Sequence, residues 1–185
     1  LFEYLLTENI NHYKSKVYIN TGNQKEYLEV KQVFLGDSEK FRFLNLDFIK
    51  EAELKKVLSF YQKLEEKKSL EKQFNRIKFC NDYLIHSNDD YTKALNLLQK
   101  TNPDEMLLQK MLLQKALIYK SQASKEKHHN YNKKAIGLLD SIISIKNNSN
   151  TYNVALNEKQ SITNKSISVE LQKYIYPNEN TRAYV

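Results

Sequence analysis

Only three glycines and two prolines occur among the 185 residues of this chain. Tight turns between strands depend heavily on these two residue types, so their scarcity argues against an all-β fold. From Glu51 onward, apolar residues recur three and four positions apart, which places them on one face of an α-helix. The sequence therefore predicts a mainly helical protein.

The helices are expected to begin at recognisable positions. Ser69, Asp89 or Asp90, and Asn102 followed by Pro103 are residues that favour helix starts. The apolar spacing predicts helices over 2–13, 51–64, 69–86, 90–98, 103–122, 135–143 and 152–163. Residues 24–35 fit a helix or a twisted strand equally well, and the alternation over 41–49 indicates extended chain.

Two of the predicted helices share a motif. The segments 93–98 and 134–139 (Lys-Ala-Leu-Asn-Leu-Leu and Lys-Ala-Ile-Gly-Leu-Leu) align without a gap, 41 positions apart. A period of about 40 residues with paired helices is typical of helical repeats. We therefore predict a tetratricopeptide-like helical repeat, or α-solenoid, over 51–165, preceded by an N-terminal helix and an irregular lead-in over 1–50.

The end of the chain has a different pattern. Apolar and polar residues alternate from Ser166 to Tyr176, as in a strand, and Pro177–Asn180 is typical of a turn. A lone hairpin is only marginally stable in water. Residues 166–185 are therefore predicted to be the first strands of a following, truncated β-sandwich.

No residue pattern predicts a catalytic, cofactor-binding or metal site. His128 and His129 are adjacent, so their side chains diverge, and a polar loop explains them. His12 and His86 lie near predicted helix ends, and Cys80 has no cysteine partner and is expected to be a buried apolar residue. A solvated helix face explains Glu65-Glu66, and a helix start explains Asp89-Asp90. No glycine-rich phosphate loop is present.

The positive charge is spread rather than clustered. The chain has 29 Lys and Arg against 22 Asp and Glu, a net charge of +7. Lysines alternate with glutamates along most helices, which is typical of solvated faces, and this arrangement disfavours nucleic-acid binding. Tyr61, Tyr83 and Tyr91 fall among apolar positions, so we expect them in the core or a groove. No run reaches the roughly 18 apolar residues that a membrane-spanning helix needs.

Several short motifs resemble those of the large bacterial alpha-2-macroglobulin-like proteins. The similar segments are Leu1–Leu6 followed by Tyr13, Val57–Leu64, Lys134–Ile136, Lys165–Val169, Pro177-Asn178 and Arg182-Ala183. In that family, a helical region ends in a helix that leads into the first macroglobulin-type β-sandwich.

The resemblance implies a non-catalytic scaffold or protein-interaction region of an exported, often lipoprotein-anchored, protease-trapping protein in the periplasm or outer envelope. Its partners would be other domains of the same chain, proteases or envelope proteins, and it would need no cofactor. It predicts an export signal before Leu1 and a β-sandwich after Val185. Two alternatives stay open, namely a free-standing tetratricopeptide-like adaptor in the cytoplasm that binds one peptide, and a basic RNA-binding repeat whose affinity falls with salt.

Overall fold

The computed structural model describes residues 2–17, 24–126, 129–145 and 149–173. This described part is mainly helical and contains no strand, so the predicted helical class is confirmed. The chain divides into two compact units, an N-terminal unit of residues 1–103 and a C-terminal unit of residues 104–185. The boundary between them lies inside the region predicted as one repeat array. We describe each unit separately.

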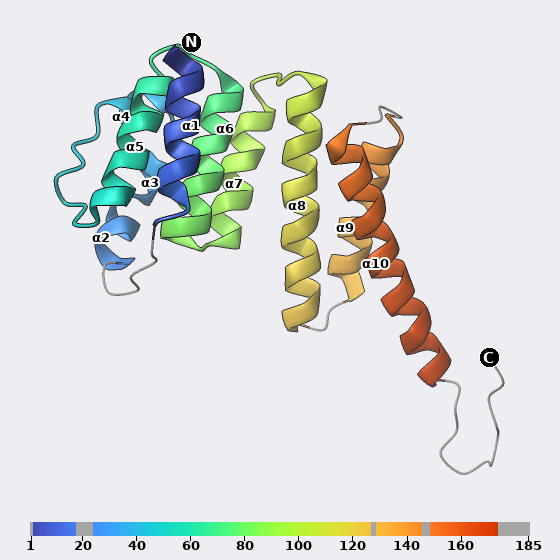
Figure 1. Cartoon of the computed structure of the whole chain (residues 1–185). Helices are drawn as coiled ribbons and strands as arrows, with labels where there is room; N and C mark the ends of the chain where they lie inside the picture. Colours follow the sequence, from blue (N-terminus) through green and yellow to red (C-terminus); the bar gives the residue numbers. More distant parts are fainter. Residues whose placement is uncertain (1, 18–23, 127–128, 146–148, 174–185) are drawn as a thin grey trace. The chain divides into compact units, whose positions relative to one another are not determined.

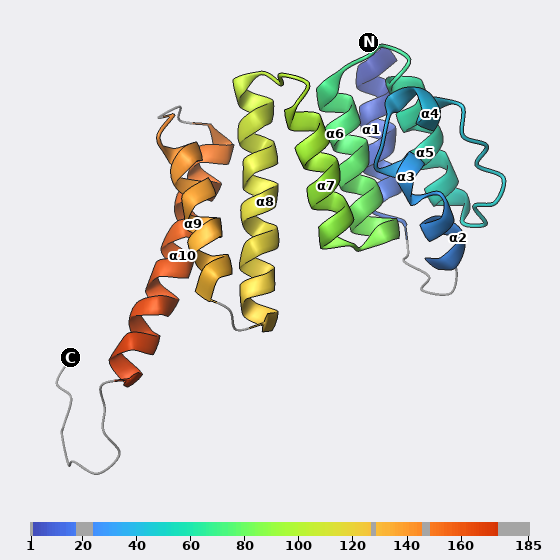
Figure 2. The same ribbon diagram turned by 180° about the vertical axis from the view of Figure 1, so that it is seen from behind.

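The N-terminal unit has a central layer of helices covered on both faces. Its elements are α1 (Phe2–Lys14), α2 (Gln24–Glu29), α3 (Lys31–Phe34), α4 (Ser38–Arg42), α5 (Ala52–Leu64), α6 (Leu70–Cys80), the π-helical turn η2 (Asn81–Ile85) and α7 (Asn88–Gln99). Helix α1 packs along α5 on one face of this layer, and α2 to α4 lie on the opposite face, as comparison of Figures 1 and 2 shows.

The apolar stripe predicted for α5 forms part of the core of this unit. Leu54, Val57, Leu58, Tyr61 and Leu64 are all buried. Each buried side chain of this size stabilises the fold by about 1.5–3 kcal/mol relative to exposure. The local spacing was therefore enough to identify the inward face of this helix.

The helix starts were predicted with mixed success. Ser69 does cap α6, and its hydroxyl accepts a hydrogen bond from the Lys72 amide at 3.5 Å. For α7 the predicted cap is wrong. The Ser87 hydroxyl, rather than the side chain of Asp89 or Asp90, caps the helix by accepting a hydrogen bond from the Asp90 amide. For α8 the predicted cap is also wrong: the Asp104 carboxylate accepts from the Leu107 amide at 2.8 Å, outside the predicted Asn102-Pro103 pair.

The ambiguous region before Glu51 is built from short helices and irregular chain. Residues 24–35 form α2 and α3, so the strand alternative is wrong. Residues 41–49 are not an extended strand either, because α4 covers the first two of them and no partner strand exists in the described chain. Instead the Gln62 amide donates to the carbonyls of Phe41 and Leu44, at 2.9 and 2.8 Å. A side chain thus satisfies backbone groups that a strand ladder would otherwise pair.

The C-terminal unit packs three long helices together. These are α8 (Glu105–Glu126), α9 (His129–Ile143) and α10 (Asn150–Lys173). Their shared core contains Leu113, Ala116, Ala135, Leu139, Ile142, Ala155 and Ile162. Ion pairs join the polar edges, with Lys120 bound to Glu158 and Lys159 bound to Asp140.

Helix α10 extends further than the sequence pattern predicted. It continues through Lys173, so residues 166–173 are helical where alternation predicted a strand. A helix pairs its own backbone groups, whereas a strand requires a neighbour, and no strand is described to provide one. The remainder of the predicted β segment, residues 174–185, lies outside the described residues.

Candidate functional site

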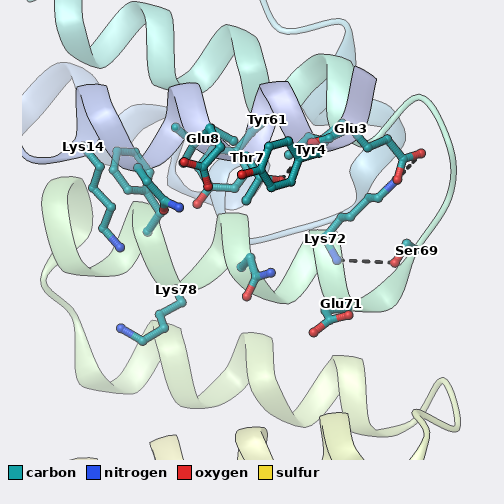
Figure 3. A pocket seen from close by; sticks show the side chains of 15 residues that line it. Glu3, Tyr4, Thr7, Glu8, Lys14, Tyr61, Ser69, Glu71, Lys72 and Lys78 are labelled. Atoms are coloured by element: carbon teal, nitrogen blue, oxygen red, sulfur yellow. Dashed lines mark hydrogen bonds and ion pairs between the residues drawn. The ribbon is translucent and has the colours of Figure 1, made fainter. Parts of the chain in front are cut away.

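One recess of the N-terminal unit is a groove between α1 and α6, which we call the α1–α6 groove. Its volume is about 520 Å³, and it is open to solvent on one side. Helix α1 forms one wall and α6 the other, as Figure 3 shows, and Tyr61 and Leu64 of α5 line it between them. The wall residues of α1 include Glu3, Thr7, Ile10 and Lys14, whose spacing places them on one helix face.

One end of the groove is bridged by an ion pair. The Lys72 ammonium of α6 lies 3.1 Å from the Glu3 carboxylate of α1, and Lys67 contributes a second contact at 3.3 Å. The hydrogen bond from Lys72, followed by that from Lys67, lowers the pKa of Glu3 below its usual value. The bridge ties α1 to α6 at this end.

The opposite end of the groove carries two lysines. Lys14 reaches from α1 and Lys78 from α6 (Figure 3). The Lys14 ammonium lies 5.9 Å from the ring centroid of Phe79 and 5.6 Å from that of Tyr83, and these two rings stack at 4.7 Å. Burial, and then the positive charge of Lys78, lower the pKa of Lys14. Lys78 itself pairs with Asp82 at 2.6 Å.

Between its two ends, the groove combines an apolar floor with polar walls. Ile10, Tyr61, Leu64 and Phe79 supply buried apolar surface. Thr7, Asn11 and Asn75 are exposed on the walls and offer uncharged hydrogen-bonding groups. Glu8 and Glu71 add carboxylates to the walls, and none of the described residues that line the groove is His or Cys. These groups offer packing, hydrogen bonding and charge for recognition.

Exposed apolar side chains lie on the first turn of α1, which carries the bridged end of the groove. Phe2, Tyr4 and Leu5, on the first turn of α1, are 62%, 65% and 49% exposed. Tyr4 also lines the groove. Exposed apolar side chains that gather beside a recess mark interaction surfaces more often than single scattered ones do. We refer to these three residues as the α1 patch.

A buried arginine organises the opposite face of the same unit. The Arg76 side chain is 0% exposed and pairs with Glu65, which is 1% exposed, at 2.8 Å. Its remaining N–H groups donate to the carbonyls of Val33, Phe34 and Gly36, so all five donors are used. The guanidinium also lies 4.4 Å from the ring centroid of Phe41. This cluster, the Arg76 node, fastens the α3–α4 connection to α5 and α6.

The Arg76 node was not predicted from the sequence, and it corrects the prediction made for Glu65. Glu65 was expected on a solvated face, yet it is buried because it neutralises Arg76. The available signal was compositional: this lysine-rich chain has only three arginines, and arginine is preferred where a planar, multiply donating cation is needed. Asp90, expected to be a cap, instead pairs with Lys31 at 2.9 Å.

The other singled-out residues lie mostly where they were predicted. Cys80 is fully buried, and burial raises the pKa of its thiol to about 12, so it is a packing residue. His12 lies in the last turn of α1, and His86 ends the π-helical turn. Tyr61 and Tyr91 are buried, and Tyr83 is half-buried. His128 and the side chain of His129 lie outside the described residues.

Comparisons with protein families, with curated proteins and with solved structures find no match to this chain. Among the residues that the structure describes, no group of three or more His, Cys, Asp or Glu side chains is placed to bind a metal ion. None of the described helices combines the length and apolar character needed to cross a membrane. The functional argument therefore rests on the α1–α6 groove.

Proposed function

We propose that this chain is a non-catalytic protein-interaction module that binds a segment of a partner protein in the α1–α6 groove. The observation that carries the proposal is the groove itself, which is open along one side and is lined in part by the exposed Tyr4 of the α1 patch. A groove between two helices, with an apolar floor and polar walls, is a common way to hold a peptide.

The dimensions of the groove favour a peptide over a small molecule. The 13 residues of α1 give a wall about 20 Å long at 1.5 Å per residue. An extended segment of about six residues spans that length. Small-molecule sites usually enclose most of the ligand surface, whereas this groove leaves one side open.

The shared motif supports a helical-repeat scaffold for this module. Segment 93–98 lies on α7, which packs on α6, and segment 134–139 lies on α9, which packs on α8. Ala94 and Ala135 are both buried, as are Leu98 and Leu139. Matching residues thus occupy matching positions on the second helix of each pair, which supports a tetratricopeptide-like arrangement.

The wider setting is a second proposal, which rests on the sequence resemblance alone. We propose that the module belongs to a bacterial alpha-2-macroglobulin-like envelope protein, acting as a scaffold in protease defence. Reading the gene on both sides of this chain tests it. An export signal upstream and macroglobulin-type β-sandwiches downstream would support it, whereas an adjoining DNA-binding or signalling domain would favour the adaptor alternative.

The groove proposal is tested by selection of peptides and by a blocking variant. Asn75 is exposed on the α6 wall, so Asn75→Trp should fill the groove without altering the core. Peptides selected from a random library on the unmodified chain should lose at least about tenfold in affinity for this variant, because their site is occupied. Fluorescence anisotropy with labelled peptides measures the loss.

The matched control is Asn96→Trp, at an exposed position of α7 outside the groove lining. It should leave the peptide affinity unchanged. Failure to select any peptide, or equal binding to the Asn75→Trp variant, would overturn the proposal.

A further inference from the structure

The two ends of the α1–α6 groove differ in how their lysines are paired. At the bridged end, Lys72 and Lys67 both form ion pairs with Glu3. At the other end, the Asp82 carboxylate is bound to Lys78. Within the described chain, no carboxylate forms an ion pair with Lys14, whose ammonium lies over the Phe79 and Tyr83 rings.

We propose that the partner segment carries an acidic side chain whose carboxylate binds between Lys14 and Lys78. This inference rests on the proposed function of the groove and specifies the chemistry of its occupant. An anion in this position would form an ion pair with Lys14. It would also accept charge-assisted hydrogen bonds from both walls, which are stronger than neutral ones.

The groups around Lys14 support an anionic occupant. From α6 it faces Lys78, and from η2 it faces Asp82 and Tyr83. Its own helix contributes Asn11 and Glu8 along the same wall. The lowered pKa of Lys14 is consistent with a cation that is half-buried and repelled by a neighbouring cation. Such a site favours a ligand that brings a carboxylate to Lys14.

The carboxylates already present favour a carboxylate ligand over a phosphate. Asp82 is bound to Lys78 and acts on Lys14, and Glu8 lines the same groove, so a singly charged group suits the two lysines better than a doubly charged one. A phosphate carries nearly two negative charges at neutral pH. The apolar floor beside the lysines, formed by Ile10, Tyr61 and Phe79, would accept an apolar side chain next to the acidic one.

The test uses defined peptides and the intact chain. The probe is a fluorescein-labelled peptide of about six residues in which Asp or Glu alternates with Leu or Phe. The control peptide, which we call the amide probe, carries Asn and Gln in place of Asp and Glu. We expect Lys14→Met and Lys78→Met each to weaken binding of the acidic probe by roughly fivefold or more, since each removes a charged hydrogen-bond donor. Added salt should weaken the acidic probe and not the amide probe.

Lys93→Met, at an exposed position of α7, is the matched control and should leave binding of the acidic probe unchanged. Circular dichroism spectra that coincide for all variants show that each is folded. Loss of affinity in the Lys93 variant equal to that in the Lys14 variant would overturn the inference, since bulk charge would then explain binding.

The remaining outcomes separate this inference from the function on which it rests. Equal binding of the acidic and amide probes, with both blocked by Asn75→Trp, would overturn the acidic anchor and leave the peptide groove standing. Tighter binding of a phosphoserine version of the probe would assign the lysine pair to phosphate and overturn the carboxylate. If no probe binds, the proposed acidic anchor is wrong. The library selection then tests independently whether the groove binds peptides.

Discussion

Replacing Arg76 by methionine is expected to destabilise the N-terminal unit by about 3–5 kcal/mol, because removing one member of a buried ion pair leaves the other charged and unpaired. The groups that would lose their hydrogen-bond donor are the Glu65 carboxylate and three backbone carbonyls of the α3–α4 region. Urea denaturation followed by circular dichroism measures the change in the free energy of unfolding.

The matched control is Arg42→Met, at the end of α4, where the guanidinium lies 5.4 Å from the exposed Phe43 ring. An exposed cation–π contact contributes about 0.5–1 kcal/mol, so the control should lose no more than that. Arg76→Lys should recover little, because an ammonium has three donors where the site uses five. Equal stability of the Arg76→Met variant and the unmodified chain would show that the Arg76 node does not hold this unit together.

The second large effect is expected at Gly36. A Cβ atom at this position would lie 2.2 Å from the carbonyl oxygen of Gln32, a distance at which the backbone itself must move. The Gly36 carbonyl also accepts hydrogen bonds from Arg76 and Gln73, both at 3.0 Å. Gly36→Ala should therefore destabilise the chain by about 2 kcal/mol or more, because overpacking and displaced hydrogen bonds act together.

Gly137 provides the opposite case within the same chain. It lies inside α9, and a Cβ atom there would meet nothing within 4 Å. Gly137→Ala should stabilise the chain by about 0.5–1 kcal/mol, since alanine loses less conformational freedom in a helix. Urea denaturation of both variants measures the contrast. A stabilising Gly36→Ala substitution would contradict the packing described around that residue.

The sequence predicted those parts of the fold that depend on residues close together in the chain. The stripe from Leu54 to Leu64 and the Ser69 cap depend on residues within a turn or two of each other, and both are present. The role of Asp90 depends on Lys31, 59 positions away, and no local pattern reveals that pairing. The alternation after Ser166 predicted a strand, but strand formation requires a partner that the local pattern cannot specify.

The α1–α6 groove was beyond prediction for the same reason. Its walls are separated by more than 50 residues, and they face each other only because α1 packs along α5. Lys14 and Lys78 look like ordinary solvated lysines in the sequence. The burial of one of them beside an aromatic stack is visible only in the folded chain. For Arg76, the scarcity of arginine was a usable signal.

The central claim, that the α1–α6 groove binds a protein segment, is tested most directly by mapping a selected peptide onto the chain by NMR. The measurement follows the backbone amides of the ¹⁵N-labelled chain as the peptide is added. We expect the largest shifts at Thr7, Asn11, Asn75 and Lys78, on the two walls of the groove. Shifts confined to α8, α9 and α10 would contradict the account and place recognition on the C-terminal unit.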